Sequence, residues 1–444
     1  MEPSIEKAIQ LSPDGYGVIE KQGKRYKIQN LLPGEEAKIQ VFRNGYGKVI
    51  EFIKLSPDRK KAECPWYNDC GGCKLQHLSY PNQLELKTAM VRELMAADGI
   101  DPTVCLNIIG MKDPTHYRNK SQMVISEKNR KVMGGFYEEF THHLVNVDQC
   151  LIQDDRANQI IKTCRTIFQE QKIPPYDENN KTGLIRHILV RIGDATGQIL
   201  VVIVTTSEVF PGRNNFLRAL RKAHPDITSV VQNVNSRSTS MVLGDFERVL
   251  FGKGMIEDVL LEKRFLIGAR TFFQVNHRQA EILYTKALEF AKPKKDDLVL
   301  DLYSGIGAIG IVFCDHVRKV ICVEENPQSV KNAILNAKLN SRRNLLFIKS
   351  KVSDYLLSMT EEDETPNIII VDPPRTGLDK SVIQRIIALS PDKIIYISCD
   401  PDTLSRDIKD FMVGTYQVKK GQPVDMFPQT NHVETVVLMS RAKG

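Results

Sequence analysis

The sequence has no hydrophobic run long enough to cross a membrane. Hydrophobic residues make up 42% of the 444 positions, but no uninterrupted apolar segment approaches the roughly 18 residues that a transmembrane helix needs. The first residues, Met1-Glu2-Pro3-Ser4, also lack the apolar core of a signal peptide. We therefore expect a cytoplasmic protein that does not bind membranes.

Internal repeats, low-complexity tracts and a strong excess of one charge are also missing. The 61 Lys and Arg against 54 Asp and Glu leave a net charge of +7, and much of this excess lies in residues 1–61. A basic N-terminal module suits a phosphate backbone, although an ordinary solvated surface explains a small excess equally well. The length exceeds one ordinary domain, so we expect two or three separate cores.

Cysteine is infrequent and odd in number, which argues against a disulfide scaffold. In a reducing compartment the nine cysteines are more often ligands, nucleophiles or core residues. Cys64, Cys70 and Cys73 lie on a loop rich in Pro and Gly, and Cys150 follows 77 residues later. Four thiolates bind either tetrahedral zinc or a [4Fe–4S] cluster, and the spacing alone does not separate the two. The remaining thiols with apolar neighbours are expected in the core: Cys105, Cys164, Cys314 and Cys322.

Residues 1–57 read as short strands separated by glycine turns. Strands are expected at 16–22, 24–29, 36–42 and 46–55, which is the pattern of a small β-barrel. Tyr16 and Tyr46, each between two glycines, lie with Arg43 at chain reversals, where they would be presented to bases and phosphates; the alternative is that the rings pack inside. The segment resembles the TRAM domain, an OB-like RNA-binding barrel.

The rest of the chain changes character at about residue 265. Before it, a helix is expected at 82–97. The region that follows is mostly stranded, with strands at 185–192 and 199–205 and helices at 154–169 and 215–222, and this mixture indicates an α+β unit. After it, buried runs at 298–302, 319–323, 367–371 and 393–398 alternate with helices, as in a doubly wound parallel sheet. The predicted domains are 1–57, 58–264 and 265–444.

A glycine-rich loop follows the first strand of the C-terminal domain. The segment Asp301-Leu302-Tyr303-Ser304-Gly305-Ile306-Gly307 opens a helix, whose first N–H groups remain available to a ligand. Together with Gly310 it also fits the dinucleotide-binding spacing, so NAD is an alternative. However, Asp301 would repel a pyrophosphate and suits the cationic amino group of a methionine moiety, while Glu324 ends the next strand and can accept ribose hydroxyls. The pattern resembles the class I methyltransferase nucleotide site.

Reactive side chains follow two further strands. Asp372 begins Asp372-Pro373-Pro374-Arg375, and Cys399 lies in Ser398-Cys399-Asp400-Pro401 at the start of a helix. The helix dipole is expected to lower the pKa of the Cys399 thiol, against the opposing charge of Asp400. Taken alone, such a cysteine is more often structural. Glu434 enters an apolar strand, which should raise the pKa of its carboxyl and make it a proton acceptor.

A cysteine and a separate carboxylate meet one specific chemical need. The C5 carbon of uracil is too weak a nucleophile to take a methyl group directly from a sulfonium. Addition of a thiolate at C6 creates an enolate whose C5 attacks readily, and a base must then remove the C5 proton before the thiolate leaves.

Five motifs in order resemble the RNA (uracil-5-)methyltransferases of the RumA/TrmA type, over essentially the whole chain. They are Phe272-Phe273-Gln274-Val275-Asn276, Asp301 to Gly307, Asp372-Pro373-Pro374-Arg375, Ser398-Cys399-Asp400-Pro401 and His432-Val433-Glu434. This resemblance implies that Cys399 is the nucleophile and Glu434 the base. It also implies that S-adenosylmethionine is bound by Gln274, Tyr303, Glu324 and Asp372.

The resemblance also bears on the cysteine cluster and on the substrate. The pattern Cys64-x5-Cys70-Gly71-Gly72-Cys73 with Cys150 is similar to the cluster-bearing branch of the family, which implies a [4Fe–4S] cluster with zinc as the alternative. The barrel together with this cluster resembles the ribosomal-RNA branch. We therefore expect a monomer that methylates C5 of uridine in 23S rRNA. A tRNA substrate, a non-catalytic RNA-binding module and an NAD-dependent oxidoreductase remain the alternatives.

Overall fold

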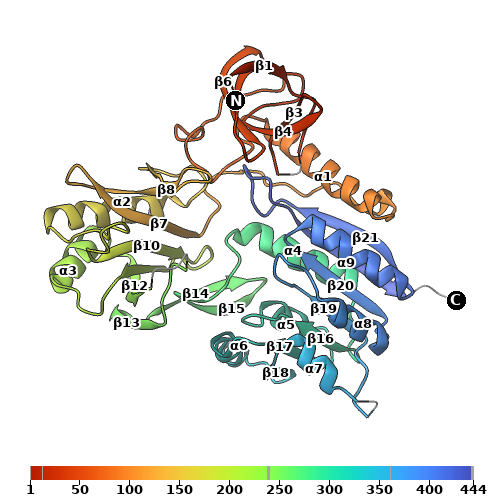
Figure 1. Cartoon of the computed structure of the whole chain (residues 1–444). Coiled ribbons are helices and arrows are strands. Elements are labelled where there is room, and N and C mark those ends of the chain that lie inside the picture. Colours follow the sequence, from red (N-terminus) through yellow and green to blue (C-terminus); the bar gives the residue numbers. More distant parts are fainter. Residues whose placement is uncertain (1, 13, 238–240, 361, 442–444) are drawn as a thin grey trace.

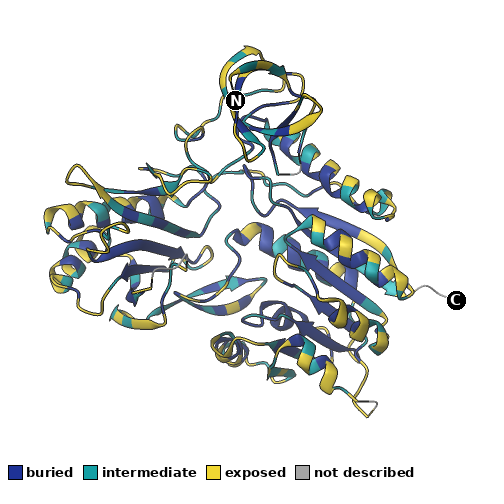
Figure 2. Cartoon of the chain, viewed as in Figure 1, coloured by how far each residue is buried: buried dark blue, intermediate teal, exposed yellow. Residues whose placement is uncertain are grey.

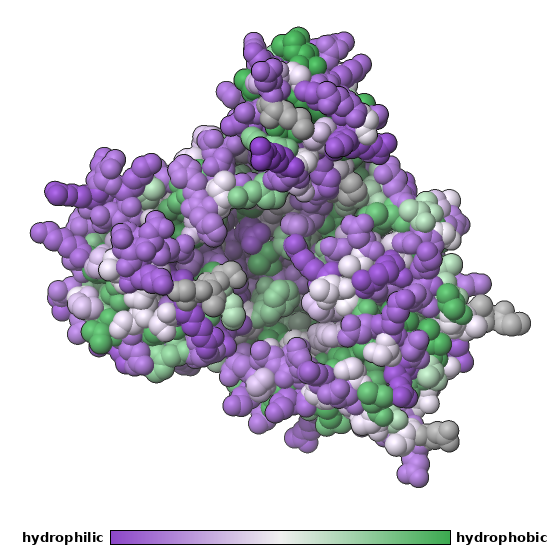
Figure 3. Space-filling view, viewed as in Figure 1, coloured by the Kyte–Doolittle hydropathy of each residue, from purple (hydrophilic) through white to green (hydrophobic). Residues whose placement is uncertain are grey.

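The computed structural model describes residues 2–12, 14–237, 241–360 and 362–441. Three sheet-based parts follow one another along the chain, namely an N-terminal barrel, a central layer and a larger C-terminal unit (Figure 1). Figure 3 shows the surface hollowed where these parts face one another. No helix in the described ranges is both long and apolar enough to span a bilayer.

The N-terminal sheet closes on itself. Its order is β1-β5-β6-β4-β3-β2, and its two outermost members, β1 and β2, are consecutive stretches of one extended segment, so the sheet begins and ends on the same piece of chain. The four predicted strands are confirmed, and the two that begin the barrel were not predicted. The strands are β1 (Ser4–Lys7), β2 (Gln10–Leu11), β3 (Gly17–Lys21), β4 (Lys24–Gln29), β5 (Glu36–Val41) and β6 (Tyr46–Lys54).

Tyr16 is not presented to solvent, and the prediction that it offers a free aromatic face is wrong. Its side chain is 5% exposed, its ring meets Tyr46 edge-on at 5.3 Å, and its hydroxyl donates to Glu139 of the central part. Lys74 lies over the same ring, with Nζ 5.1 Å from the centroid. The ring joins the barrel to its neighbour because burial of the aromatic face and the hydrogen bond to Glu139 act together.

The central part is a seven-stranded sheet with two helices on one face. Strand order is β13-β12-β11-β10-β7-β8-β9. The helices are α2 (Asp155–Glu170) and α3 (Arg213–Ala223), and their apolar faces pack on the sheet. Every residue of β10 and β11 is buried (Figure 2), because both faces of the sheet are covered at these strands. The strands are β7 (Lys120–Lys128), β8 (Lys131–Tyr137), β9 (Leu144–Asn146), β10 (Ile185–Ile192), β11 (Ile199–Thr205), β12 (Ile227–Val234) and β13 (Phe246–Phe251).

The C-terminal unit is the doubly wound sheet that was predicted. Its order is β18-β17-β16-β19-β20-β22-β21. The first five strands are parallel. Strand β22 is antiparallel to both of its neighbours, β20 and β21, so β21 runs in the same direction as the first five. The strands are β16 (Leu298–Leu302), β17 (Lys319–Glu324), β18 (Leu345–Lys349), β19 (Ile368–Val371), β20 (Lys393–Ser398), β21 (Tyr416–Val424) and β22 (Glu434–Arg441).

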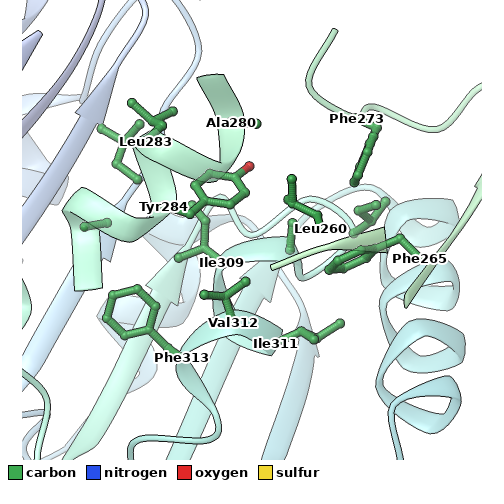
Figure 4. Close-up of a cluster of buried hydrophobic side chains, with 14 of the residues drawn as sticks. Leu260, Phe265, Phe273, Ala280, Leu283, Tyr284, Ile309, Ile311, Val312 and Phe313 are labelled. Atoms are coloured by element: carbon green, nitrogen blue, oxygen red, sulfur yellow. The ribbon is translucent and has the colours of Figure 1, made fainter. Parts of the chain in front are cut away.

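Alternating residues of these strands enter two cores. On β16, Val299 belongs to one core and Leu300 and Leu302 to the other, as the two-residue period of a strand requires. The first core includes residues of α4 (His277–Ala291) and α5 (Ala308–Phe313), and part of it is drawn in Figure 4. The second core includes residues of α7 (Val352–Ser358), α8 (Lys380–Leu389) and α9 (Pro401–Val413). Helix α6 (Pro327–Leu339) contacts β17 and β18.

Two segments differ from the expected division of the chain. Helix α1 (Tyr80–Ala97) and the 3-10 turn η1 (Pro102–Val104), expected with the central part, pack instead on the second core of the C-terminal sheet. The hairpin of β14 (Met255–Leu260) and β15 (Lys263–Gly268) forms a separate two-stranded sheet against the first core, so the expected boundary at 264/265 falls inside β15. Neither segment was assignable from sequence, because an amphipathic helix or hairpin does not specify which sheet it covers.

Candidate active site

One edge of the C-terminal sheet carries most of the predicted site residues. Parallel pairing in register aligns the ends of β16, β17 and β19, so Tyr303, Glu324 and Asp372 lie at or just beyond the same edge. Strand β22 runs antiparallel, and its register with β20 brings Glu434 beside Cys399. In open α/β sheets the carboxyl ends of the strands are where ligands bind.

The glycine-rich loop is held by two carboxylates. The N–H of Gly310 donates to Oδ2 of Asp301 at 3.0 Å, and the N–H of Gly305 donates to Oε2 of Glu324 at 3.0 Å. A Cβ on Gly310 would come within 2.5 Å of the Cys322 sulfur, so only glycine allows this close approach of helix and strand. The other oxygen of Asp301, Oδ1, is buried and has no partner among the described residues.

Burial perturbs the acids at this edge. Asp301 is inaccessible to solvent, and burial followed by the nearby charge of Asp372 raises the pKa of its carboxyl to about 8. Burial raises the pKa of Asp372 to about 7. Both shifts disfavour the charged form, and a cationic group placed against the orphaned Asp301 oxygen would favour the carboxylate again.

Tyr303 and Gln274 approach the same edge from different segments. Tyr303 has a left-handed backbone, with φ of 63°, a strained conformation that in non-glycine residues costs of order 1 to 3 kcal/mol and is common at functional sites. Gln274 is 7% exposed, and its side chain hydrogen-bonds Tyr284 of α4. The four predicted donor residues therefore lie at the ends of three strands and in the loop before α4.

Cys399 and Glu434 form the second half of the site. Glu434 is 4% exposed, and burial, then the charge of Asp372, raises the pKa of its carboxyl to about 8. The predicted upward shift is confirmed. Cys399 is half-buried, and it lies close enough to Glu434 and Asp372 for both charges to act on its thiol.

The predicted lowering of the Cys399 pKa is wrong. Burial, followed by the charges of Glu434 and Asp372, raises the pKa of this thiol to about 11, against the opposing effect of Arg375. The charge of Asp400 also raises this pKa, as expected, and its carboxylate caps α9 by accepting the N–H of Thr403 at 3.1 Å. The acids that raise the pKa most, Glu434 and Asp372, are far from Cys399 in the sequence.

The comparisons with known proteins agree with this geometry. The sequence model of the tRNA (Uracil-5-)-methyltransferase family matches residues 247–442. Two proteins described as uncharacterized RNA methyltransferases are similar over nearly the full length. The Bacillus cereus protein is 38% identical over 98% of this chain and 95% of its own length. The Oceanobacillus iheyensis protein is 39% identical over 96% and 94%.

A solved structure is similar to all three parts of the chain. The tRNA (uracil-54, C5)-methyltransferase of Pyrococcus abyssi, in complex with S-adenosyl-L-homocysteine, matches with a TM-score of 0.79 and 25% identity, covering 99% of this chain and 100% of that one. The chain belongs to the RNA (uracil-5-)methyltransferase family. It is an RNA methyltransferase that uses S-adenosylmethionine.

The segment before Glu434 is held in place by distant parts of the chain. Asp425 accepts hydrogen bonds from Lys87 at 2.6 Å and from Tyr80 at 2.8 Å, and both partners belong to α1. The carbonyl of Gln429 accepts the N–H groups of Lys74 and Leu75, each at 3.0 Å. Residues 425–429 are thus fixed by segments that are far away in sequence.

Tyr284 is the site residue that the sequence analysis missed. Its hydroxyl lies where the charges of Asp372, Glu434 and Asp301 all act, and burial followed by these charges raises its pKa. Figure 4 shows its ring among the apolar side chains of the first core, with the hydroxyl oxygen pointing away from Ile309 and Val312. Tyr284 lies at helical spacing from other apolar residues, a pattern that predicts a core tyrosine. No local sequence pattern indicated a role in the site.

Arg375 and His432 are two polar side chains near the Cys399 edge that remain accessible from outside. Nη2 of Arg375 lies 3.4 Å from Nε2 of His432, and burial followed by the Arg375 charge lowers the pKa of His432 to about 4. The imidazole is therefore neutral at pH 7. A neutral ring beside a guanidinium offers one cation and one ring face at the mouth of the methyltransferase site.

The four predicted ligand cysteines of the methyltransferase line one cavity of about 320 Å³. All four are free and half-buried: Cys64, Cys70, Cys73 and Cys150. In residues 2–12, 14–237, 241–360 and 362–441, no group of three or more His, Cys, Asp or Glu side chains is arranged as a site for a metal ion. The thiols still influence each other, since burial and then the charge of Cys150 raise the pKa of Cys73 to about 12. The four cysteines predicted in the core are buried, as expected.

Proposed function

We propose that this enzyme methylates C5 of a uridine in 23S rRNA. One observation carries the proposal. The half-buried thiol of Cys399 lies near the buried carboxyl of Glu434, and both lie beside the glycine-rich loop, where Oδ1 of Asp301 is buried without a hydrogen-bond partner among the described residues. A nucleophile next to a separate proton acceptor is what addition to C6, methyl transfer to C5 and removal of the C5 proton require.

The reaction divides between these two residues. The Cys399 sulfur adds to C6, and the electron pair of the C5=C6 bond becomes the enolate. C5 then attacks the methyl carbon. The bond between that carbon and the sulfonium breaks, and the donor becomes a neutral thioether. Glu434 takes the C5 proton, and the C6–S bond breaks as the ring double bond re-forms. Since burial raises the pKa of Glu434 to about 8, the carboxylate is a stronger base than an exposed glutamate.

The methyl donor is assigned to the edge formed by β16 and β17. Glu324 would accept hydrogen bonds from the ribose hydroxyls, and Asp372, Gln274 and Tyr303 would complete the donor site. The buried, unpartnered oxygen of Asp301 supports a place for the cationic amino group of the methionine moiety. A dinucleotide would bring two phosphate charges against this acid, which disfavours the NAD alternative.

The four cysteines are proposed to hold a [4Fe–4S] cluster. Their chemistry fits, because four thiolates are its usual ligand set, and the cavity of about 320 Å³ that they line is larger than a single ion needs. Zinc is the alternative. The cluster would tie Cys150 to the loop that carries Cys64, Cys70 and Cys73, and no step of the methyl transfer depends on it.

The N-terminal barrel is proposed to be a TRAM-like RNA-binding module. The closed sheet supports this assignment, and so does Tyr46, which is only partly buried and has Lys27 6.0 Å from its ring centroid. Tyr16 is excluded from the contact surface because it is buried.

A tRNA is the second candidate substrate. The barrel and the cysteine loop were expected to separate the rRNA branch from the tRNA branch, but the Pyrococcus abyssi tRNA enzyme is matched over 99% of this chain. Methyl transfer from labelled S-adenosylmethionine to 23S rRNA and to total tRNA, followed by nucleoside analysis, tests both. We expect 5-methyluridine in 23S rRNA. If 5-methyluridine forms in tRNA alone, the substrate is tRNA and not 23S rRNA. If it forms in neither RNA, the proposed function is refuted.

A further inference from the structure

The central part contains a second cavity, of about 620 Å³, that the proposed reaction does not use. It is bounded by β7, by β10, by the start of β9 and by the connection between α2 and β10, which includes residues 174–183. Cavities of this size accommodate small organic ligands.

The cavity lies where β7 continues beyond its pairing with β10, because Val124 is the last β7 residue paired with β10 and residues 124–127 all line the cavity. Val124 of β7 and His187 of β10 are register partners and both line the cavity. The neighbours of Val124, Met123 and Ile125, belong to the core under α2 and α3, so Val124 and His187 point to the opposite face. On that face Leu189 joins the core shared with the C-terminal sheet.

Aromatic side chains supply flat apolar walls. Tyr176 and Tyr137 both line the cavity and are partly buried. The guanidinium of Arg186 lies 5.0 Å from the Tyr176 ring centroid, and the exposed ring of His142 meets Tyr137 edge-on at 5.7 Å. Such surfaces stack well on nucleobases, whatever the sequence.

Two buried polar side chains that line the cavity have atoms without partners. Nδ1 of His187 and Nε of Arg186 are buried and make no hydrogen bond among the described residues. These side chains are 9% and 5% exposed. Nη1 of Arg186 donates to the carbonyls of Asn235 and Arg237, at 3.0 and 2.5 Å, so the guanidinium is fixed in position. Buried polar groups are seldom left unpaired, and a planar ligand with ring acceptors would satisfy them.

The charges around the cavity favour a base over a phosphate. Glu127, Asp177 and Glu178 are in its lining, and burial followed by the charge of Glu178 raises the pKa of the Tyr137 hydroxyl. Asp177 is engaged in its own turn, where it accepts the N–H of Asn179 at 2.8 Å. The other carboxylates would repel a phosphate and accept hydrogen bonds from an exocyclic amine.

We propose that this cavity binds an unpaired nucleobase of the substrate RNA, separate from the methylated uridine, and that it prefers bases with an exocyclic amine. Adenine, cytosine and guanine present such an amine and a ring acceptor, whereas uracil presents no amine. The proposal rests on RNA being the substrate, as in the proposed function. It adds a second point of recognition, which would fix the RNA strand relative to Cys399.

Ligand-observed NMR with free nucleosides tests the cavity without methyl transfer. The full-length enzyme is first saturated with S-adenosylhomocysteine, so that adenosine cannot report on the donor site. Adenosine, cytidine and guanosine should bind at least roughly tenfold more tightly than uridine. His142→Ala and Glu178→Gln should each weaken that binding. Binding should be unchanged in His143→Ala, a matched control, because His143 neighbours His142 but does not line the cavity.

With the RNA substrate, His142→Ala should raise KM by roughly tenfold, the value of one lost stacking contact, and leave kcat unchanged. Equal binding of uridine and the amine-bearing nucleosides would overturn the proposal, as would binding that both cavity variants leave unchanged. If the cavity binds nucleosides selectively but the enzyme methylates no RNA, the cavity is a nucleobase site and the proposed function is refuted. Failure of the cavity proposal and failure of the proposed function are therefore distinguishable.

Discussion

At the scale of single residues, the acids that surround Cys399 dominate its chemistry. The thiol has a pKa of about 11 because of burial and the charges of Glu434 and Asp372, so on the order of one molecule in ten thousand carries a thiolate at pH 7. A nucleophile held mainly as the thiol is protected from adventitious oxidation until the substrate arrives.

The alkylation rate of Cys399 should therefore rise about tenfold per pH unit between pH 7 and 10. The charge of Glu434 exists only above its own pKa of about 8. Glu434→Gln should thus speed alkylation about threefold at pH 9.5, equivalent to half a pKa unit, and leave it unchanged at pH 6.5. Peptide-resolved mass spectrometry after iodoacetamide treatment measures both rates. Glu325→Gln is the control, and an equal effect of Glu434→Gln at both pH values would contradict this account.

We expect Asp301 to make donor binding depend on pH. Its pKa of about 8 leaves it mostly protonated at pH 7, and a cationic amino group against its free oxygen would favour the carboxylate. Binding of S-adenosylhomocysteine should therefore release close to one proton at pH 7. At pH 9.5 the carboxyl is already ionised and much of the ligand's amino group is neutral, so binding as the cation should take up protons instead. Titration calorimetry in buffers of different ionisation enthalpy measures the release. An equal proton count at the two pH values would show that Asp301 does not contact the amino group.

Sequence reasoning placed the candidate residues Cys399 and Glu434 in one site but did not predict their environment. The Ser398-Cys399-Asp400-Pro401 motif predicts a thiol at a helix start, and α9 does begin there. The direction of its pKa shift depends on Glu434 and Asp372, which come from other strands. Tyr284 was missed for the same reason, since its polar neighbours come from separate segments.

At the scale of elements, a buried ion pair fastens α1 to the segment before Glu434. Nζ of Lys87 and Oδ1 of Asp425 are 2.6 Å apart, with side chains 1% and 0% exposed. Lys87 also donates to the carbonyl of Phe427 at 3.1 Å. Helix α1 was predicted from its pattern at 82–97, but a lysine within it gave no indication of a buried partner 338 positions later.

Lys87→Met should lower the free energy of unfolding of the C-terminal unit by about 3 to 5 kcal/mol, because Asp425 would remain buried without its cation. Urea denaturation of the full-length protein, monitored by far-UV circular dichroism, measures this loss. Lys60→Met, which removes the exposed pair with Glu63, is the matched control and should cost less than about 1 kcal/mol. A Lys87→Met protein as stable as the control would refute the structural role of the pair.

Element boundaries were predictable wherever the local pattern decided them. Strands β10 and β11 begin and end where their apolar runs do, and α6 begins at Pro327 after the cap Asn326, as its sequence indicates. The short strands β1 and β2 were not predicted, because two to four residues carry too little periodicity.

At the scale of the whole molecule, the cysteine loop joins the three parts. Residues Cys64 to Cys73 follow the barrel, and Cys150 belongs to the central part. Lys74 and Leu75, directly after the loop, hydrogen-bond Gln429 of the C-terminal unit. A cluster on the four thiols would therefore stabilise the relative position of barrel, central sheet and catalytic edge.

The enzyme purified without air should contain roughly four irons per chain. Cys150→Ser should lose most of that iron and lower the melting temperature, because the loop would no longer be tied to the central sheet. Binding of S-adenosylhomocysteine should stay unchanged, since the donor edge belongs to a separate sheet. Cys399→Ser is the control and should retain the iron. One zinc per chain, or full iron in Cys150→Ser, would contradict the cluster assignment.

The central claim is that Cys399 adds to C6 of the target uridine. The most direct measurement mixes the enzyme with S-adenosylmethionine and substrate RNA that carries 5-fluorouridine, whose fluorine cannot leave as a proton, and looks for an RNA adduct by denaturing electrophoresis and mass spectrometry. We predict a stable, methylated adduct through Cys399 that is absent in Cys399→Ala. No adduct with the parent enzyme, or an equal adduct in Cys399→Ala, would contradict the account.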